Sequence, residues 1–265
     1  MTSQYVDNSK GAIQMKKLCY LFIAIVLLSS CASRIPNSDN KKEIATATQR
    51  LGEEYYSAGN YSAALKTLLE AYETIPDDPH LNNSLGLVYL AKEKYDLAET
   101  HLKKALDLKK DYLEAKNNLG AAYLKQEKWS LAIECFEEVS KNLVYAYPEI
   151  PLSNLGWAYF HQKKYEKAKT YFNKSLEIKP DFLISIHGLA SIYIGTGFHL
   201  KAIDFLHQEL TRNPGAAILH SDIAKAYEAT NDFHMAKKSW DIVLKLVPET
   251  SSLAREAKKK LLELN

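Results

Sequence analysis

Apolar positions along this chain recur with a period close to 34 residues. Each copy begins with an apolar residue and a small residue, has a tyrosine four residues after the apolar one, and reaches an alanine nine residues later. The six copies begin at Leu51-Gly52, Leu85-Gly86, Leu119-Gly120, Leu155-Gly156, Leu189-Ala190 and Ile223-Ala224, at steps of 34, 34, 36, 34 and 34 residues. Self-similarity at such a period predicts a stacked array of equivalent structural units.

Within one copy the apolar residues fall on two short segments at helical spacing. In residues 79–112 the first segment precedes Glu93-Lys94 and the second follows it. Each copy is therefore expected to be an antiparallel helix pair. The small residue after the apolar one is expected where two backbones approach, because a larger side chain there would cost about 1–3 kcal/mol through overpacking. Four copies end in a proline, which stops the second helix: Pro76, Pro180, Pro214 and Pro248.

The aligned Leu-Gly, Tyr, Ala and Pro positions resemble the tetratricopeptide repeat family over residues 45–248. This resemblance implies an all-α superhelix of six helix pairs that serves as a binding scaffold and not as an enzyme. Residues 249–265 are expected to form a C-terminal capping helix, since the ends of such arrays need a polar outer face.

The amino-terminal segment has the composition of an export signal. Met15-Lys16-Lys17 precedes an apolar run from Leu18 to Leu28, which is shorter than the roughly 20 residues of a membrane span. The stretch before Met15 is polar and unlike the start of a signal, so Met15 is the expected initiator, with Met1 as the alternative. Residues 1–30 are predicted to be a signal peptide, removed from the working protein.

Leu28-Ser29-Ser30-Cys31 resembles the bacterial lipoprotein signal, which implies that Cys31 carries acyl groups. The alternative is an ordinary cleaved signal in which Cys31 is incidental. Ala32 stands where an inner-membrane retention signal would place Asp, so the resemblance implies the periplasmic face of the outer membrane. Residues 31–44 are expected to be the lipidated cysteine and a flexible tether.

Charge and cysteine content narrow the range of partners. Loss of residues 1–30 removes three lysines and one aspartate, so 34 basic residues become 31 and 32 acidic residues become 31. A neutral chain has no net basic field for phosphate, which argues against nucleic acid. With Cys19 lost with the signal and Cys31 acylated, Cys135 would remain as the single free cysteine and is expected to be an apolar filler.

Sequence motifs for catalysis, cofactors and metals are missing. The chain has no glycine-rich phosphate loop, zinc-binding His-Glu-x-x-His helix or nucleophile elbow, and its eight histidines follow no ligand spacing. No cofactor, metal site or enzymatic activity is predicted.

A candidate binding surface follows from the first helix of each pair, which is expected to line the concave side. Its predicted residues are apolar, aromatic or amide side chains: Leu87, Leu90, Leu124, Trp157, Phe160, Asn83, Asn117, Asn118 and Asn154. Amides can pair with an extended backbone, and aromatic side chains are typical anchors. An apolar helix or strand is the expected ligand. In the alternative interpretation, Trp157 and Phe160 serve packing alone.

The single irregular step lies around residues 142–151, directly before Asn154-Leu155-Gly156-Trp157-Ala158-Tyr159. A connection rich in tyrosine and proline, followed by this motif in the fourth of six repeats, resembles the pilotin lipoproteins of type IV pilus biogenesis. The resemblance implies a protein partner, an outer-membrane secretin, whose assembly the lipoprotein assists. The alternative is an adaptor lipoprotein that recruits peptidoglycan hydrolases, envelope proteases or secretion components.

Overall fold

The computed structural model describes residues 38–264 and shows thirteen helices and no strand within them. The helices are α2 (Ser38–Ser57), α3 (Tyr61–Tyr72), α4 (Pro79–Ala91), α5 (Tyr95–Leu108), α6 (Leu113–Lys125), α7 (Trp129–Ser140), α8 (Glu149–His161), α9 (Tyr165–Ile178), α10 (Leu183–Gly195), α11 (His199–Arg212), α12 (Ala217–Ala229), α13 (Phe233–Leu246) and α14 (Ser252–Glu263). The predicted all-α fold of six helix pairs is confirmed. The predicted signal peptide and Cys31 lie outside the described residues.

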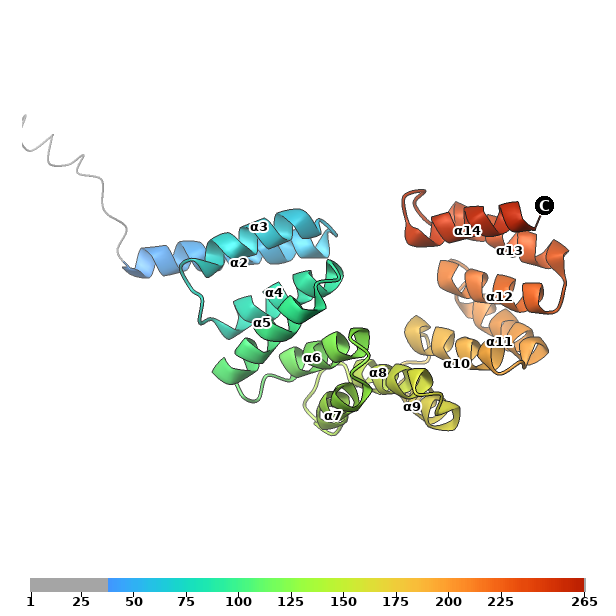
Figure 1. Cartoon of the computed structure of the whole chain (residues 1–265), viewed down its shortest axis with the longest axis horizontal. Helices are drawn as coiled ribbons and strands as arrows, with labels where there is room; N and C mark the ends of the chain where they lie inside the picture. The colour runs from blue at the N-terminus through green and yellow to red at the C-terminus, as the bar shows by residue number, and fades with distance from the viewer. Residues whose placement is uncertain (1–37, 265) are drawn as a thin grey trace, which may run out of the picture.

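Contacts between neighbouring pairs explain why the array is curved. Each even-numbered helix from α2 to α12 contacts the next even-numbered helix, whereas no contacts between successive odd-numbered helices occur in the described part of the chain. The even-numbered helices are therefore closer together and form the inner side of an open arc (Figure 1). The first and last helix pairs face each other across the opening of this arc.

The core is built from one large side chain in each second helix, seated on the small residue of the first helix. These side chains are fully buried: Leu68, Leu102, Phe136, Phe172, Leu206 and Trp240. A Cβ added at Gly86 would lie 2.5 Å from Leu102 Cγ, and one added at Gly156 would lie 2.5 Å from Phe172 Cδ1. The small residue is thus required by contact with the facing helix, as the sequence predicts.

The turn inside each helix pair has a conserved backbone shape across the array. The middle one of its three residues has a positive φ in all six pairs, between 58° and 82°. The residues there are Gly59, Glu93, Glu127, Lys163, Gly197 and Asn231. Glycine and asparagine tolerate this left-handed conformation best, so the two glutamates and the lysine hold it against a steric cost.

The first helix begins earlier than predicted. Helix α2 starts at Ser38, inside the segment 31–44 that was expected to be a tether. Residues 38–43 are polar but include good helix formers, and Ala45 in the next turn is buried. Polarity alone therefore does not end the helix, and α2 extends beyond the amino-terminal end of the predicted first repeat.

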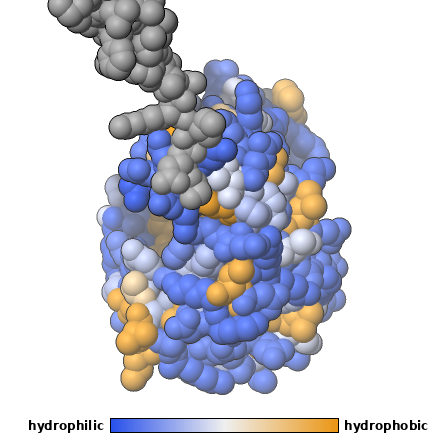
Figure 2. Space-filling model, turned by 90° about the vertical axis from the view of Figure 1, so that its left-hand side faces the viewer, coloured by the Kyte–Doolittle hydropathy of each residue, from blue (hydrophilic) through white to orange (hydrophobic). Residues whose placement is uncertain are grey.

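Helix α14 takes the place predicted for the capping helix. Ser251 accepts a hydrogen bond from the Ala254 backbone N–H, and Ala254 and Ala257 are buried against the last pair. Lys260 pairs with Glu228 at 2.9 Å. The outer side of the array at the amino-terminal end is mostly hydrophilic, with separate apolar side chains (Figure 2), as expected for the solvent-facing side of a helical array.

Candidate functional site: the concave wall

The candidate apolar residues lie on the inner helices α4, α6 and α8. Leu87, Leu90, Leu124, Trp157 and Phe160 are all half-buried. All except Leu87 also pack against the main core cluster. These side chains therefore present one side to the core and leave the other side exposed on the concave wall, where a partner could contact it.

Trp157 is the centre of an aromatic cluster. Its ring lies 5.3 Å from Phe160, 5.4 Å from the fully buried Phe172 and 5.2 Å from His187, centroid to centroid. The contacts with Phe160 and Phe172 are edge-to-face, a favoured arrangement for aromatic pairs. Packing and exposure thus coexist at Trp157, and its replacement by alanine would disturb the core as well as the wall.

The candidate asparagines form hydrogen bonds between adjacent inner helices. Asn118 Nδ2 donates to Asn83 Oδ1 at 2.9 Å, and Asn154 Nδ2 donates to Asn117 Oδ1 at 3.3 Å. In each case the residue two before the repeat leucine pairs with the residue one before the leucine of the next repeat. Asn83 and Asn117 are buried, so their amides serve to join the helices, and only the half-buried Asn118 and Asn154 keep amide groups near the surface for a ligand.

The same two positions carry a hydrogen-bonded histidine and aspartate further along the array. His187 Nδ1 and Asp222 Oδ2 are 2.6 Å apart, and the Asp222 side chain is almost completely buried. Burial raises the pKa of Asp222, and the hydrogen bond with His187 opposes that rise. A polar inter-helix contact thus recurs between α10 and α12.

Between α8 and α10 this polar contact is missing. The corresponding positions are Ser153 and Gly188, and Ser153 Oγ is a buried oxygen that has no hydrogen-bond partner in the described chain. Gly188 has no side chain because Phe172 occupies the space, with Phe172 Cζ 2.3 Å from where a Cβ would lie. Sequence reasoning missed this interruption, although a glycine in place of the asparagine at this repeat position was its signal.

Comparison with known families decides the nature of the array. Models of the tetratricopeptide repeat family match residues 79–143 and 151–182, which correspond to the pairs α4 to α7 and the pair α8 and α9. This is a tetratricopeptide repeat protein. Such repeats are protein-interaction scaffolds, so the concave wall of this tetratricopeptide repeat protein is a candidate surface for a protein partner.

Solved structures of two pilus proteins have the same fold as this tetratricopeptide repeat protein. PilF of Pseudomonas aeruginosa is 22% identical, with a TM-score of 0.61, and the likeness covers 83% of this chain and 99% of PilF. PilW, described as a widely conserved type IV pilus biogenesis factor, is 19% identical, with a TM-score of 0.68 over 81% of this chain and 98% of PilW. The similarity thus extends over nearly the whole of both proteins.

Two further relatives show how widely the repeat is used. A tetratricopeptide repeat protein of Parabacteroides merdae is 15% identical, with a TM-score of 0.72 over 89% of this chain and 88% of that protein. Anaphase-promoting complex subunit 3 of Schizosaccharomyces pombe is 34% identical over 110 residues, which are 41% of this chain and only 16% of that subunit. The fold therefore occurs in unrelated settings, and function must be argued from the site.

Other candidate chemistry is limited in the described region. Cys135 is half-buried against the core, and burial raises the pKa of its thiol to about 11, which keeps it protonated and unreactive. Among residues 38–264 no group of three or more His, Cys, Asp or Glu is placed to hold a metal. The helices in this range include none that is long and apolar enough to cross a membrane.

Proposed function

We propose that this protein is an outer-membrane lipoprotein that binds a protein partner on its concave wall and acts as a pilotin, assisting secretin assembly in type IV pilus biogenesis. The observation that carries the proposal is the likeness in fold to PilF and PilW over 99% and 98% of those chains. The lipoprotein-like Leu28-Ser29-Ser30-Cys31 supports it independently.

The concave wall suits an apolar segment of such a partner. Leu90, Leu124, Trp157 and Phe160 offer half-exposed apolar surface on adjacent inner helices. Buried aromatic anchors dominate binding energy at protein interfaces, and the amide groups of the half-buried Asn118 and Asn154 can pair with a bound backbone. No catalytic step is needed. The scaffold would hold the segment beside the membrane and raise its local concentration through the anchor.

Deletion of the gene is expected to remove most secretin multimers from the outer membrane. Heat-resistant multimers would be measured on a semi-native gel after membrane fractionation, with the wild-type gene as complement. Ser191 of inner helix α10 is half-buried and occupies the repeat position of Leu87 and Trp157 on the wall. The Ser191→Glu variant should complement poorly, because the replacement adds charge there without removing a packed side chain. Ser191→Ala is the matched control and should complement fully. Multimers unchanged in amount and location after deletion would contradict the pilotin role.

The Cys31→Ser variant is expected to leave the outer membrane. Stable anchoring needs more than one acyl chain, and all the acyl groups proposed here depend on this single thiol. Radiolabelled palmitate incorporation and fractionation measure the outcome, with Cys135→Ser as the matched control that keeps its label. Continued labelling of Cys31→Ser with unaltered fractionation would show that the lipidation assignment is wrong.

A further inference from the structure

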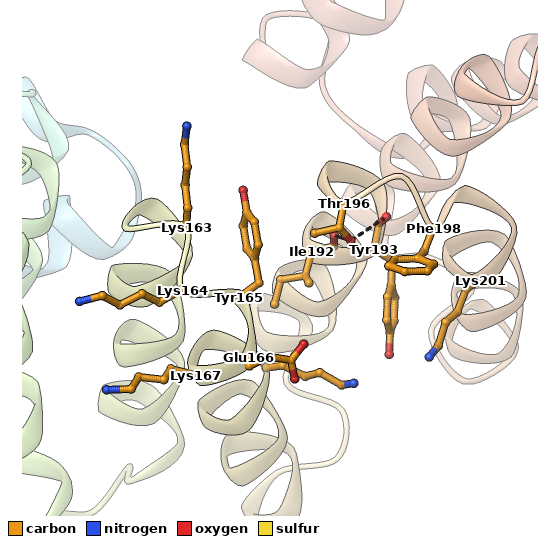
Figure 3. Close-up of a pocket in the computed structure, with 11 residues that line it drawn as sticks. Lys163, Lys164, Tyr165, Glu166, Lys167, Ile192, Tyr193, Thr196, Phe198 and Lys201 are labelled. Carbon is orange, nitrogen blue, oxygen red and sulfur yellow. Dashed lines mark hydrogen bonds between the residues drawn. The ribbon is translucent and has the colours of Figure 1, made fainter.

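A second candidate surface lies at the turn ends of the fourth and fifth helix pairs. A pocket of about 820 Å³ opens between the start of α9, the end of α10 and the start of α11. We name it the lysine pocket. The side chains that define it are Lys163, Lys164, Tyr165, Lys167, Phe198 and Lys201 (Figure 3).

The lysine pocket exists because a side chain present in the preceding repeat is missing here. The first residue of α7, Trp129, is covered by His161, whose ring stacks on it at 5.0 Å with an interplanar angle of 7°. One repeat later the first residue of α9 is Tyr165, and the position of His161 is taken by Gly195. A Cβ added at Gly195 would meet no heavy atom within 4 Å.

The residue that follows Gly195, Thr196, does not fill the lysine pocket either. In the third pair this position is Gln126, whose Nε2 donates to the Tyr95 backbone carbonyl of the preceding pair at 3.3 Å. In the fifth pair it is Thr196, whose hydroxyl donates to Ile192 of its own helix at 2.6 Å. The space equivalent to that above Tyr165 is therefore filled by His161 at Trp129 and narrowed by Gln126 at Tyr95, where a smaller pocket of about 250 Å³ remains.

The charge around the lysine pocket is strongly positive. Its lining includes five lysines and one glutamate, in a chain whose formal net charge is only +2. None of the five lysines forms an ion pair with any of residues 38–264. Lys201 Nζ lies over the Tyr193 ring at 4.9 Å, and Phe198 is 63% exposed. Cationic and aromatic groups are thus exposed together.

We infer that the lysine pocket binds an acidic peptide segment of a protein partner through one aromatic side chain. The aromatic side chain would stack on Tyr165 as His161 stacks on Trp129, and carboxylates on either side would pair with the lysines. The site is separate from the concave wall, so it does not depend on the proposed pilotin role.

The spread of the lysines favours an extended acidic segment over a single phosphate group. In Figure 3 the side chain of Lys163 points away from those of Lys164 and Lys167, and Lys201 lies on the far side of Tyr193. A compact phosphate would need donors that converge on one point, whereas several carboxylates along a peptide match charges that are set apart. The apolar faces of Tyr165 and Phe198 give the aromatic side chain its contact.

A fluorescent peptide tests the inference on the full chain in detergent solution. The probe is Asp-Glu-Asp-Trp-Glu-Asp-Glu, compared by anisotropy with one peptide carrying Ser in place of Trp and one carrying Asn and Gln in place of the acids. We expect each control peptide to bind at least tenfold more weakly. Binding of the probe should also weaken as salt rises, because the pairs are near the surface. Equal binding of all three peptides would overturn the inference.

Variants of the protein then test whether the probe binds in the lysine pocket. Gly195→His restores the missing side chain and should weaken probe binding at least tenfold, whereas Gly215→His is the matched control and should not, since a Cβ there also meets nothing within 4 Å. Lys201→Gln should weaken binding about threefold without filling the pocket. Equal probe binding by Gly195→His and wild type would overturn the inference. Binding to phosphatidylglycerol vesicles is measured for the same variants. If Gly195→His abolished vesicle binding but left probe binding unchanged, the inference would also be overturned.

Discussion

Phe172→Ala is expected to lower the free energy of unfolding by about 3–5 kcal/mol, the range for truncating a fully buried aromatic side chain. Phe172 is 0% exposed and its ring is enclosed by Gly156, Gly188 and Trp157. Neither glycine has a side chain that could move into the cavity. Urea unfolding followed by circular dichroism at 222 nm measures the loss.

Phe198→Ala is the matched control, because the same side chain is removed from a position that is 63% exposed. Its effect should stay within about 0.5 kcal/mol, as for most surface substitutions. If the two variants unfolded at the same urea concentration, Phe172 would not be a core residue.

Phe172→Ala should also change the cooperativity of unfolding. Phe172 belongs to a core cluster that extends from the first pair to Leu189 and Ile192, and a second cluster begins at Ile186. Repeat arrays are stabilised by contacts between neighbours, so a weakened contact here allows the two halves to unfold separately. In this variant, the backbone amides on one side of residue 172 should exchange hydrogen faster than those on the other side.

The second large effect concerns two glycine-to-alanine substitutions in α10, which are expected to change the stability of the protein in opposite directions. Gly188→Ala is expected to destabilise the protein by about 1–3 kcal/mol, because the new Cβ would lie 2.3 Å from Phe172 Cζ in an enclosed space. Gly195→Ala, in the same helix, meets open space and should be neutral or stabilising by up to about 1 kcal/mol, through helix propensity.

The melting temperatures of these two variants provide the measurement, since they carry the same chemical change in the same helix. A fall for Gly188→Ala with no fall for Gly195→Ala is the expected pattern. If both fell equally, the effect would belong to the helix backbone and not to contact with Phe172.

The sequence was sufficient to predict the architecture. The period of the apolar residues predicts six helix pairs, and the Leu-Gly and Ala positions predict where their backbones approach, because these features depend on residue type and spacing alone. The start of α2 was predicted wrongly, because residues 38–43 were judged by polarity, although they include helix formers that extend a packed helix.

The site was predicted less completely. Trp157 and Phe160 were assigned to the wall, but their contacts with Phe172 and with each other depend on the curvature of the array, which no repeat period contains. The pairing of Asn83 with Asn118 joins residues 35 apart and depends on the relative shift of two helices. The lysine pocket was missed because Gly195 appears in the sequence only as a helix end.

The interrupted contact at Ser153 and Gly188 has a mechanical consequence. Side-chain hydrogen bonds or ion pairs join the neighbouring inner helices α2 to α4, α4 to α6, α6 to α8 and α10 to α12. Between α8 and α10, apolar packing around Phe172 stands in their place. Apolar contacts are not directional, whereas hydrogen bonds are. At this joint the angle between the inner helices is therefore set by the fit of the side chains packed around Phe172, and no directed bond between α8 and α10 fixes it.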